Sequence, residues 1–209
     1  TERLDQQALP AASRATAELL PARLSEAVKA RTRIAAADAI VLADGPAGDF
    51  YISRALPPED QARAKAALLD ILKGQPQVAA VFTAEELAAT PAPTGSPQDW
   101  SLLERARASY FPGRSGDLVV LLGRAVMPIP DPGRGYVATH GSPWDYDRRV
   151  PILFWRRGLA GFEQPAPVET VDIAPTLAAL LGLKVPAGEF DGRCLDIDGG
   201  AGDICGDGT

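Results

Sequence analysis

A chain of 209 residues with 46% hydrophobic and 23% charged side chains has the length and composition of one globular domain, or of one domain with a small insertion. Its formal net charge of −6 and its scattered Lys and Arg residues argue against a nucleic-acid partner, because no basic surface remains to neutralise phosphates. No apolar run approaches the roughly 20 residues that a membrane helix needs, so no membrane partner is expected.

The first third of the sequence predicts helices alternating with short strands. Residues 12–34 have the apolar spacing of a helix, with Pro21 as a kink or a restart. Two short strands at residues 39–44 and 48–56 flank a Gly-Pro-Ala-Gly turn, which indicates a hairpin. A strong helix follows at residues 59–74 and is closed by its last residue, a glycine.

The same alternation continues to a buried strand near the middle of the chain. Residues 78–83 are predicted as a strand, and Thr83 with Glu86 has the spacing of a capping box for the next helix. Another helix is predicted within residues 99–110, and a strand at 117–123. The order β-β-α-β-α-β indicates a small α+β unit of ferredoxin-like character inserted in something larger.

The pattern changes at residue 125, and we expect a second part at 125–209 after the α+β part at 1–124. Residues 125–149 read as a long loop, and long ordered loops tend to carry function. The sequence VPILFW at 150–155 is almost purely apolar, which is typical of a strand covered on both faces. We predict that this strand lies near the centre of a parallel sheet, with the loop at the rim of the sheet.

A last helix is predicted in VETVDIAPTLAALLGL, residues 168–183. Asp172 is expected as its N-cap, and Pro175 falls in the first turn, where proline is tolerated. Gly182 is expected to end the helix.

The C-terminal tail contains the two cysteines of the chain, Cys194 and Cys205. Their spacing is too wide for a zinc-binding Cys-x-x-Cys pair, so a small disulfide loop is favoured over two unpaired thiols. Asp196, Asp198 and Asp203 miss the spacing of a calcium loop. A disulfide implies an oxidising compartment, and we expect a periplasmic or secreted protein, although the start of the chain shows no signal-peptide pattern.

His140 is the only histidine and the one candidate for catalytic chemistry. The sequence contains neither a phosphate-binding P-loop nor a G-x-S-x-G nucleophile motif. Zinc requires three or four ligands, and this region supplies one imidazole. Asp145 and Asp147 are close in sequence, but acidic residues in such a place are more often caps or ion-pair partners. Spacing alone therefore favours an ordinary histidine over a metal ligand.

Three segments resemble the C-terminal end of the alkaline phosphatase superfamily. They are THGSPWDYDRRVPILFW at 139–155, VETVDIAPTLAALLGL at 168–183 and DGRCL at 191–195. They resemble in particular the bacterial single-chain alkaline phosphatases with a threonine nucleophile. Residues 50–122 resemble the cap-like insertion between the metal-ligand segments of that family, so the resemblance covers about residues 3–195.

The resemblance implies an α/β fold: the C-terminal part of an alkaline-phosphatase-like parallel sheet with helices on both faces, preceded by a small α+β insertion. It implies that His140 is a zinc ligand, the last histidine of a site that holds two Zn²⁺ ions in the complete enzyme. Tyr146 and Asp147 match family positions and are expected to be structural, with Asp147 orienting the loop or pairing with Arg149.

The nucleophile and the other ligands of the family precede the segments seen here, so we expect no catalytic residue in this chain and the N-terminal part of the same enzyme as its partner. The resulting hypothesis is the C-terminal part of a zinc-dependent alkaline phosphatase that hydrolyses phosphate monoesters through a phosphoryl-enzyme intermediate. The alternatives are a non-catalytic binding or assembly domain on the same scaffold, and a phosphodiesterase or phosphonate hydrolase. Without the N-terminal part, exposed apolar surface is expected.

Overall fold

The computed structural model describes residues 11–133, 135, 137–186, 188–198 and 202–206. Contacts divide the chain into two units, each considered separately below. The first unit comprises Thr1–Thr94 and Trp100–Arg148, and the second comprises Gly95–Asp99 and Arg149–Thr209. The division predicted from the sequence, into residues 1–124 and 125–209, stays a prediction.

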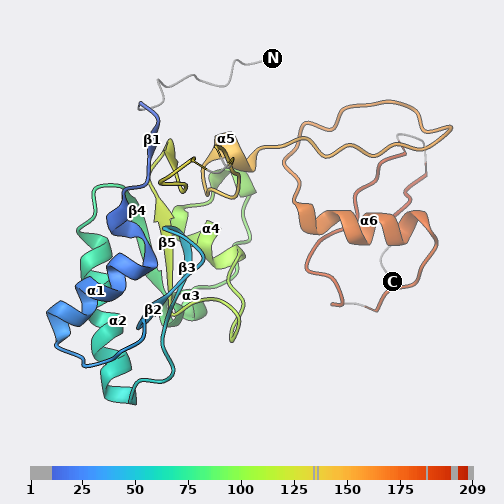
Figure 1. Cartoon of the computed structure of the whole chain (residues 1–209). Coiled ribbons are helices and arrows are strands. Elements are labelled where there is room, and N and C mark those ends of the chain that lie inside the picture. Colours follow the sequence, from blue (N-terminus) through green and yellow to red (C-terminus); the bar gives the residue numbers. More distant parts are fainter. Residues whose placement is uncertain (1–10, 134, 136, 187, 199–201, 207–209) are drawn as a thin grey trace. The chain divides into compact units, whose positions relative to one another are not determined.

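The first unit contains every strand of the described residues (Figure 1). In chain order its elements are β1 (Ser13–Arg14), the 3₁₀ helix η1 (Ala17–Leu19), α1 (Pro21–Thr32), β2 (Val41–Leu42), β3 (Gly48–Ile52), α2 (Pro58–Lys73), β4 (Val78–Thr83), α3 (Ala84–Ala89), α4 (Leu102–Ala108), β5 (Leu118–Leu122), β6 (Val126–Met127) and α5 (Asp145–Arg148).

The main sheet of this unit has the strand order β2-β3-β5-β4. Because β3 and β4 each pair antiparallel with β5, they run parallel to each other, and α2 connects them across the intervening strand. This is the split β-α-β arrangement of the predicted ferredoxin-like unit. Figure 1 shows α1 and α2 on one side of the sheet and α3 and α4 on the other. A separate parallel pair joins β1 to β6.

Local sequence signals account for the helices. α1 begins at Pro21, so the proline restarts the helix. α2 ends at the predicted Gly74, whose N–H bonds back to the last turn. The capping box of α3 is present, with the Thr83 side chain accepting from the Glu86 N–H. These interactions lie within a few residues of each other, which is why the sequence alone predicts them.

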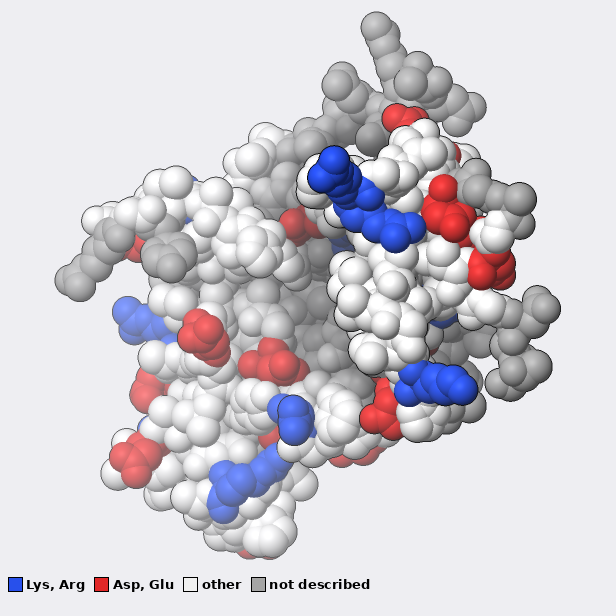
Figure 2. Space-filling view, turned by 90° about the vertical axis from the view of Figure 1, so that its right-hand side faces the viewer, with Lys and Arg blue, Asp and Glu red and all other residues white. Residues whose placement is uncertain are grey.

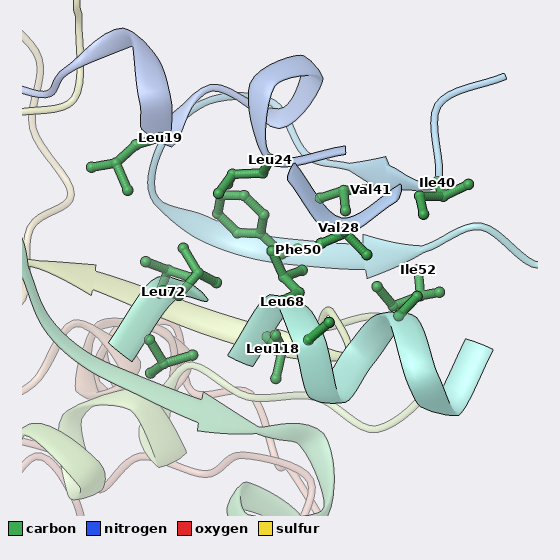
Figure 3. Close-up of a cluster of buried hydrophobic side chains, with 14 of the residues drawn as sticks. Leu19, Leu24, Val28, Ile40, Val41, Phe50, Ile52, Leu68, Leu72 and Leu118 are labelled. Carbon is green, nitrogen blue, oxygen red and sulfur yellow. The ribbon is translucent and has the colours of Figure 1, made fainter. Parts of the chain in front are cut away.

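The core of the first unit lies between the sheet and the helices α1 and α2 (Figure 3). The residues of β5 alternate between buried and half-buried, as expected for a strand whose faces differ in their covering. α2 contributes a buried stripe at helical spacing. The largest fully buried side chains include Leu24, Val28, Phe50, Ile52, Leu68, Leu72 and Leu118.

The second unit contains the 3₁₀ helices η2 (Pro97–Asp99) and η3 (Thr170–Asp172) and the helix α6 (Ile173–Leu180). α6 ends as predicted: Gly182 has φ +65°, its N–H bonds to the Ala179 carbonyl, and the Leu183 N–H bonds to the Ala178 carbonyl. This pair of bonds is a Schellman motif, which glycine permits because it adopts positive φ without strain.

The strand predicted at residues 150–155 is wrong for this chain. These residues have no strand pairing, and Leu153 and Trp155 are 88% and 85% exposed. A central strand needs a neighbour on each edge to satisfy its N–H and C=O groups, and the described residues supply none here. The exposed apolar surface expected without the N-terminal part is therefore present.

The fold class itself is confirmed as mixed α/β, with a parallel strand pair, an antiparallel sheet and helices on both sides of that sheet. Among the described residues, no helix combines the length and the apolar character needed to cross a bilayer.

Candidate functional site

His140 lies in the long segment between β6 and α5, which has no helix or strand in its described residues. Its side chain is exposed, and Gly141 beside it has φ +101°, a conformation that a side chain would strain. Among the described residues, no hydrogen bond reaches the ring nitrogens. The imidazole is therefore available to a ligand.

The first anchor of this segment is Arg14 of β1. Its Nη1 donates to the Ile129 carbonyl at 3.0 Å and its Nη2 donates to the Val137 carbonyl at 3.1 Å. Arg14 pairs with Met127 in the β1–β6 ladder, so its backbone is held beside the start of the segment. The guanidinium thus holds two points of the loop to one strand.

The second anchor is Asp147, whose Oδ2 accepts the Ser142 N–H at 2.6 Å. This agrees with the predicted orienting role of Asp147. The alternative pairing with Arg149 is not what the structure contains, because Arg149 donates to Gln98 Oε1 at 2.9 Å. Tyr146 is structural as predicted: its hydroxyl accepts the Ala125 N–H at 3.0 Å.

Arg105 of α4 holds the residues after His140. Its Nε donates to the Trp100 carbonyl at 2.8 Å, and its Nη1 donates to the Pro143 carbonyl at 2.7 Å. Its Nη2 lies 3.1 Å from Asp145 Oδ1. The Trp144 indole N–H donates to the Leu122 carbonyl, which ties the same stretch to the end of β5.

The donor chemistry near His140 fits one ligand of a zinc site. An imidazole nitrogen is a good zinc ligand, whereas Asp145 is paired with Arg105 and Arg148 and Asp147 is bonded to Ser142. Among the described residues, no group of three or more His, Cys, Asp and Glu side chains could hold a metal ion. The described residues therefore offer one candidate zinc ligand, His140, where a zinc site requires three or four.

On the face shown in Figure 2, Lys and Arg are interspersed with Asp and Glu, and neither sign forms a broad patch. One ion pair among the described residues, Arg105–Asp145, lies beside the His140 segment.

In the second unit, the predicted N-cap Asp172 has a different role. It occupies the residue before α6, but its side chain makes no cap hydrogen bond to the helix. Instead it is 3% exposed, and it accepts the N–H of Glu169 and the N–H of Arg193, each at 2.9 Å. Asp172 is therefore at the predicted N-cap position of α6, but its carboxylate belongs to the capping box of η3 with Glu169 and binds the Arg193 N–H, so it does not cap α6 itself.

The segments VDIAPT and DGRCL, which the sequence singled out separately, are bonded to each other. Thr176 Oγ1 donates to the Asp172 carbonyl at 2.6 Å and accepts the Leu195 N–H at 2.9 Å. Gly192 allows this approach, because a Cβ there would overlap the carbonyl of Val171. The backbone N–H groups of Arg193 and Leu195 thus bind DGRCL to side chains at the start of α6.

The disulfide prediction is confirmed: Cys194 and Cys205 are bonded, with their Cα atoms 5.7 Å apart. Both cysteines line a groove of about 440 Å³ beside α6, whose other walls include Ala178, Leu183 and Phe190. The disulfide closes a loop within the tail, beside the last helix.

Comparison with known proteins gives a consistent family. Alkaline phosphatase PhoK of Sphingomonas sp is 49% identical over 205 residues, which are 98% of this chain and 36% of that protein. Alkaline phosphatase PhoD of Zymomonas mobilis is 51% identical over 197 residues, 94% of this chain and 34% of that protein. The chain matches a C-terminal part of an alkaline phosphatase superfamily enzyme. It spans about a third of the length of the curated relatives it matches.

The fold agrees with this alkaline phosphatase match. The crystal structure of wild-type alkaline phosphatase PafA superposes with a TM-score of 0.69 at 21% identity, covering 90% of this chain and 34% of PafA. Identity this low supports the fold alone. No family model matches the sequence.

Sequence reasoning singled out His140, Tyr146, Asp147 and Asp172, and the assignment of His140 as a metal ligand stays a prediction. It missed Arg14 and the other residues that hold these segments: Arg105, Thr176 and Gly192. Arg14 is 115 residues from Ile129, and no local pattern in the sequence signals such a contact.

Proposed function

We propose that this chain is the C-terminal part of a zinc-dependent alkaline phosphatase, which hydrolyses phosphate monoesters through a phosphoryl-enzyme intermediate. The observation that carries the proposal is the 49% identity to alkaline phosphatase PhoK over 98% of the chain. The nucleophile and the remaining metal ligands belong to the N-terminal part of the enzyme, since this chain spans about a third of such proteins.

Within this proposal, His140 is one ligand of a site with two Zn²⁺ ions. When bound, zinc supplies a Lewis acid that stabilises charge on a phosphoryl oxygen and favours the alkoxide of the nucleophile. The chain contributes an exposed imidazole on a segment whose neighbouring backbone groups are bonded to Arg14 and Asp147. In this proposal the carboxylates of Asp145 and Asp147 are not metal ligands, because they bind Arg105, Arg148 and the Ser142 N–H.

The proposed partner is the N-terminal part of the same enzyme, and the exposed apolar residues of the second unit support this. Val150, Leu153 and Trp155 are 61%, 88% and 85% exposed, and large side chains exposed in one run mark a surface that another part of a protein covers. A strand supplied by the missing part would also satisfy the backbone groups of residues 150–155.

The proposed location is the periplasm or the exterior of the cell. The Cys194–Cys205 disulfide supports it, because structural disulfides form and persist in oxidising compartments. Retention of this bond in protein isolated with free thiols blocked at lysis tests the location.

The function is tested by co-expressing this chain with the rest of the enzyme, supplying zinc and measuring phosphate release from an aryl phosphate. We expect His140→Ala to lower kcat/KM by more than about 100-fold, since loss of an outer partner of a metal ligand already costs about 10–100-fold. Leu42→Ala, at a 47% exposed leucine of β2 outside this segment, is the control and should leave kcat/KM unchanged.

Two outcomes overturn this proposal. If the zinc-loaded assembly releases no phosphate and His140→Ala changes neither activity nor zinc content, the non-catalytic binding or assembly domain is correct. If an aryl phosphodiester or an aryl phosphonate is cleaved faster than the monoester, the phosphodiesterase or phosphonate hydrolase is correct.

A further inference from the structure

The segment around His140 combines an exposed ligand with an anchored backbone. Residues 138–141 are exposed and lie outside helices and strands. On each side of them, however, a backbone group is bonded to a side chain of another element: the Val137 carbonyl to Arg14, and the Ser142 N–H to Asp147. A flexible loop that must become ordered on metal binding loses conformational entropy, and anchors on both sides reduce that loss.

We propose that Arg14 and Asp147 are positioning residues for His140, which present its imidazole to the metal by fixing the two ends of residues 137–142. The inference rests on the proposed function for the identity of the metal, and on the observed contacts for the two anchors. Neither residue touches the metal or the substrate in this proposal.

Arg14 is suited to this role because its own backbone is fixed. The Ser13 N–H bonds to the Ala125 carbonyl, and the Ala15 N–H bonds to the Met127 carbonyl. Gln77, the residue before β4, binds the same stretch through its side chain. It donates to the Arg14 carbonyl at 2.8 Å and accepts the Thr16 N–H at 2.8 Å. A rigid strand therefore carries the guanidinium to the loop.

The guanidinium is also the group that the geometry requires. It donates through Nη1 to Ile129 and through Nη2 to Val137, so one planar fork closes the loop between these residues. Lysine carries the same charge but has a single ammonium on a flexible stem and does not reproduce a planar fork. Arg14→Lys therefore keeps the positive charge at this position and removes the two-pronged hydrogen bonding of the guanidinium.

Asp147 fixes the other end through a short bond of 2.6 Å between its Oδ2 and the Ser142 N–H. Its backbone is held in α5, where its N–H bonds to the Trp144 carbonyl at 2.9 Å. Bonds from a backbone N–H to a carboxylate are stronger than neutral ones. Asp147→Asn keeps one acceptor oxygen at this position, whereas Asp147→Ala removes it.

The first test is the order of residues 137–142 in the 209-residue chain without metal, measured as backbone amide order parameters by NMR relaxation. We expect wild-type values of about 0.85, as for rigid backbone, and values below about 0.6 in Arg14→Lys and Asp147→Ala. The order parameters of β5 should stay unchanged. Asp147→Asn should restore most of the order. Arg31→Lys is the matched control, because Arg31 forms an exposed pair with Asp70 on α1 and α2.

The second test is zinc retention by the chain assembled with the rest of the enzyme, measured by elemental analysis against increasing chelator. Arg14→Lys and Asp147→Ala should lose zinc at a chelator concentration about 10–100-fold lower than the wild type, the usual effect of removing an outer partner of a ligand. Zinc added in excess should restore kcat, because these residues hold the ligand and do not act on substrate.

Order parameters of residues 137–142 that stay at wild-type values in both variants would refute the anchors, whatever the enzyme does. Lower order with unchanged zinc retention would refute the positioning of His140. A wild-type assembly without zinc would refute the proposed function and the metal half of this inference, and the order parameters would still decide the anchors.

Discussion

At the scale of single residues, glycine and buried polar groups determine how the last part of the chain is held. Asp172 accepts two backbone N–H groups, and Thr176 links the Asp172 carbonyl to the Leu195 N–H. Both side chains are buried, where an unsatisfied partner is costly. Gly192 lets the two segments approach, because a side chain at this position would overlap the Val171 carbonyl. The hydrogen bonds between the segments therefore require glycine here.

Gly192→Ala is therefore expected to destabilise the second unit by about 1–3 kcal/mol, the usual cost of forcing extra volume into a packed place. Amide exchange of α6 gives this local free energy directly. Gly161→Ala is the matched control in the same unit, because a Cβ there meets nothing within 4 Å. Equal α6 protection in the two variants would show that Gly192 is not a tight contact.

At the scale of elements, helix caps reach the His140 segment through α4. Ser101 and Glu104 form a capping box: the Ser101 N–H donates to Glu104 Oε2 at 2.8 Å, and the Ser101 hydroxyl donates to the same oxygen at 2.7 Å. The next residue of the helix, Arg105, holds Pro143 and Asp145. The start of α4 thus positions the residues that follow His140.

This capping box should depend on pH. Hydrogen bonds from the Ser101 side chain and then from the Ser101 backbone lower the pKa of Glu104 from its ordinary value of 4.5. A carboxylate with a depressed folded pKa stabilises the fold above its unfolded pKa, and this stabilisation is lost as the pH falls through the folded pKa.

We expect wild type to be more stable than Glu104→Gln at about pH 7, and the difference to shrink towards about pH 3. Urea unfolding followed by circular dichroism at the two pH values measures it. Glu26→Gln, which removes an exposed carboxylate outside any capping box, controls for the loss of charge. A difference that grows as the pH falls would contradict the assignment.

At the scale of the whole molecule, the first unit is a sheet covered by helices and has its own hydrophobic core. The second unit has no strands among its described residues. The second unit leaves large apolar side chains exposed, and its disulfide lies in the tail beside α6. The exposed apolar residues 150–155 are the surface on which the proposed N-terminal part would pack, and the chain spans about a third of the length of its relatives.

Leu153→Asp should lower co-purification of this chain with the tagged N-terminal part by more than about tenfold, since a charge replaces an apolar anchor in a desolvated interface. The isolated chain should keep its helical content, because Leu153 is 88% exposed in it. Leu42→Asp makes the same change at a 47% exposed leucine of β2 and should leave co-purification unchanged. Equal loss in both variants would place the partner elsewhere.

The sequence by itself determined the features that depend on neighbouring residues. The capping box at Thr83 and Glu86, the restart at Pro21 and the helix end at Gly182 are interactions within a few residues, so local patterns predict them. The family resemblance also identified His140 as the residue to test. Only the tertiary structure decided which distant groups meet: Arg14 with the loop before His140, and Asp172 with the backbone of Arg193. Residues 150–155 show why local composition is not enough. Their composition predicts a buried strand, but a strand forms only where other strands satisfy its backbone N–H and C=O groups.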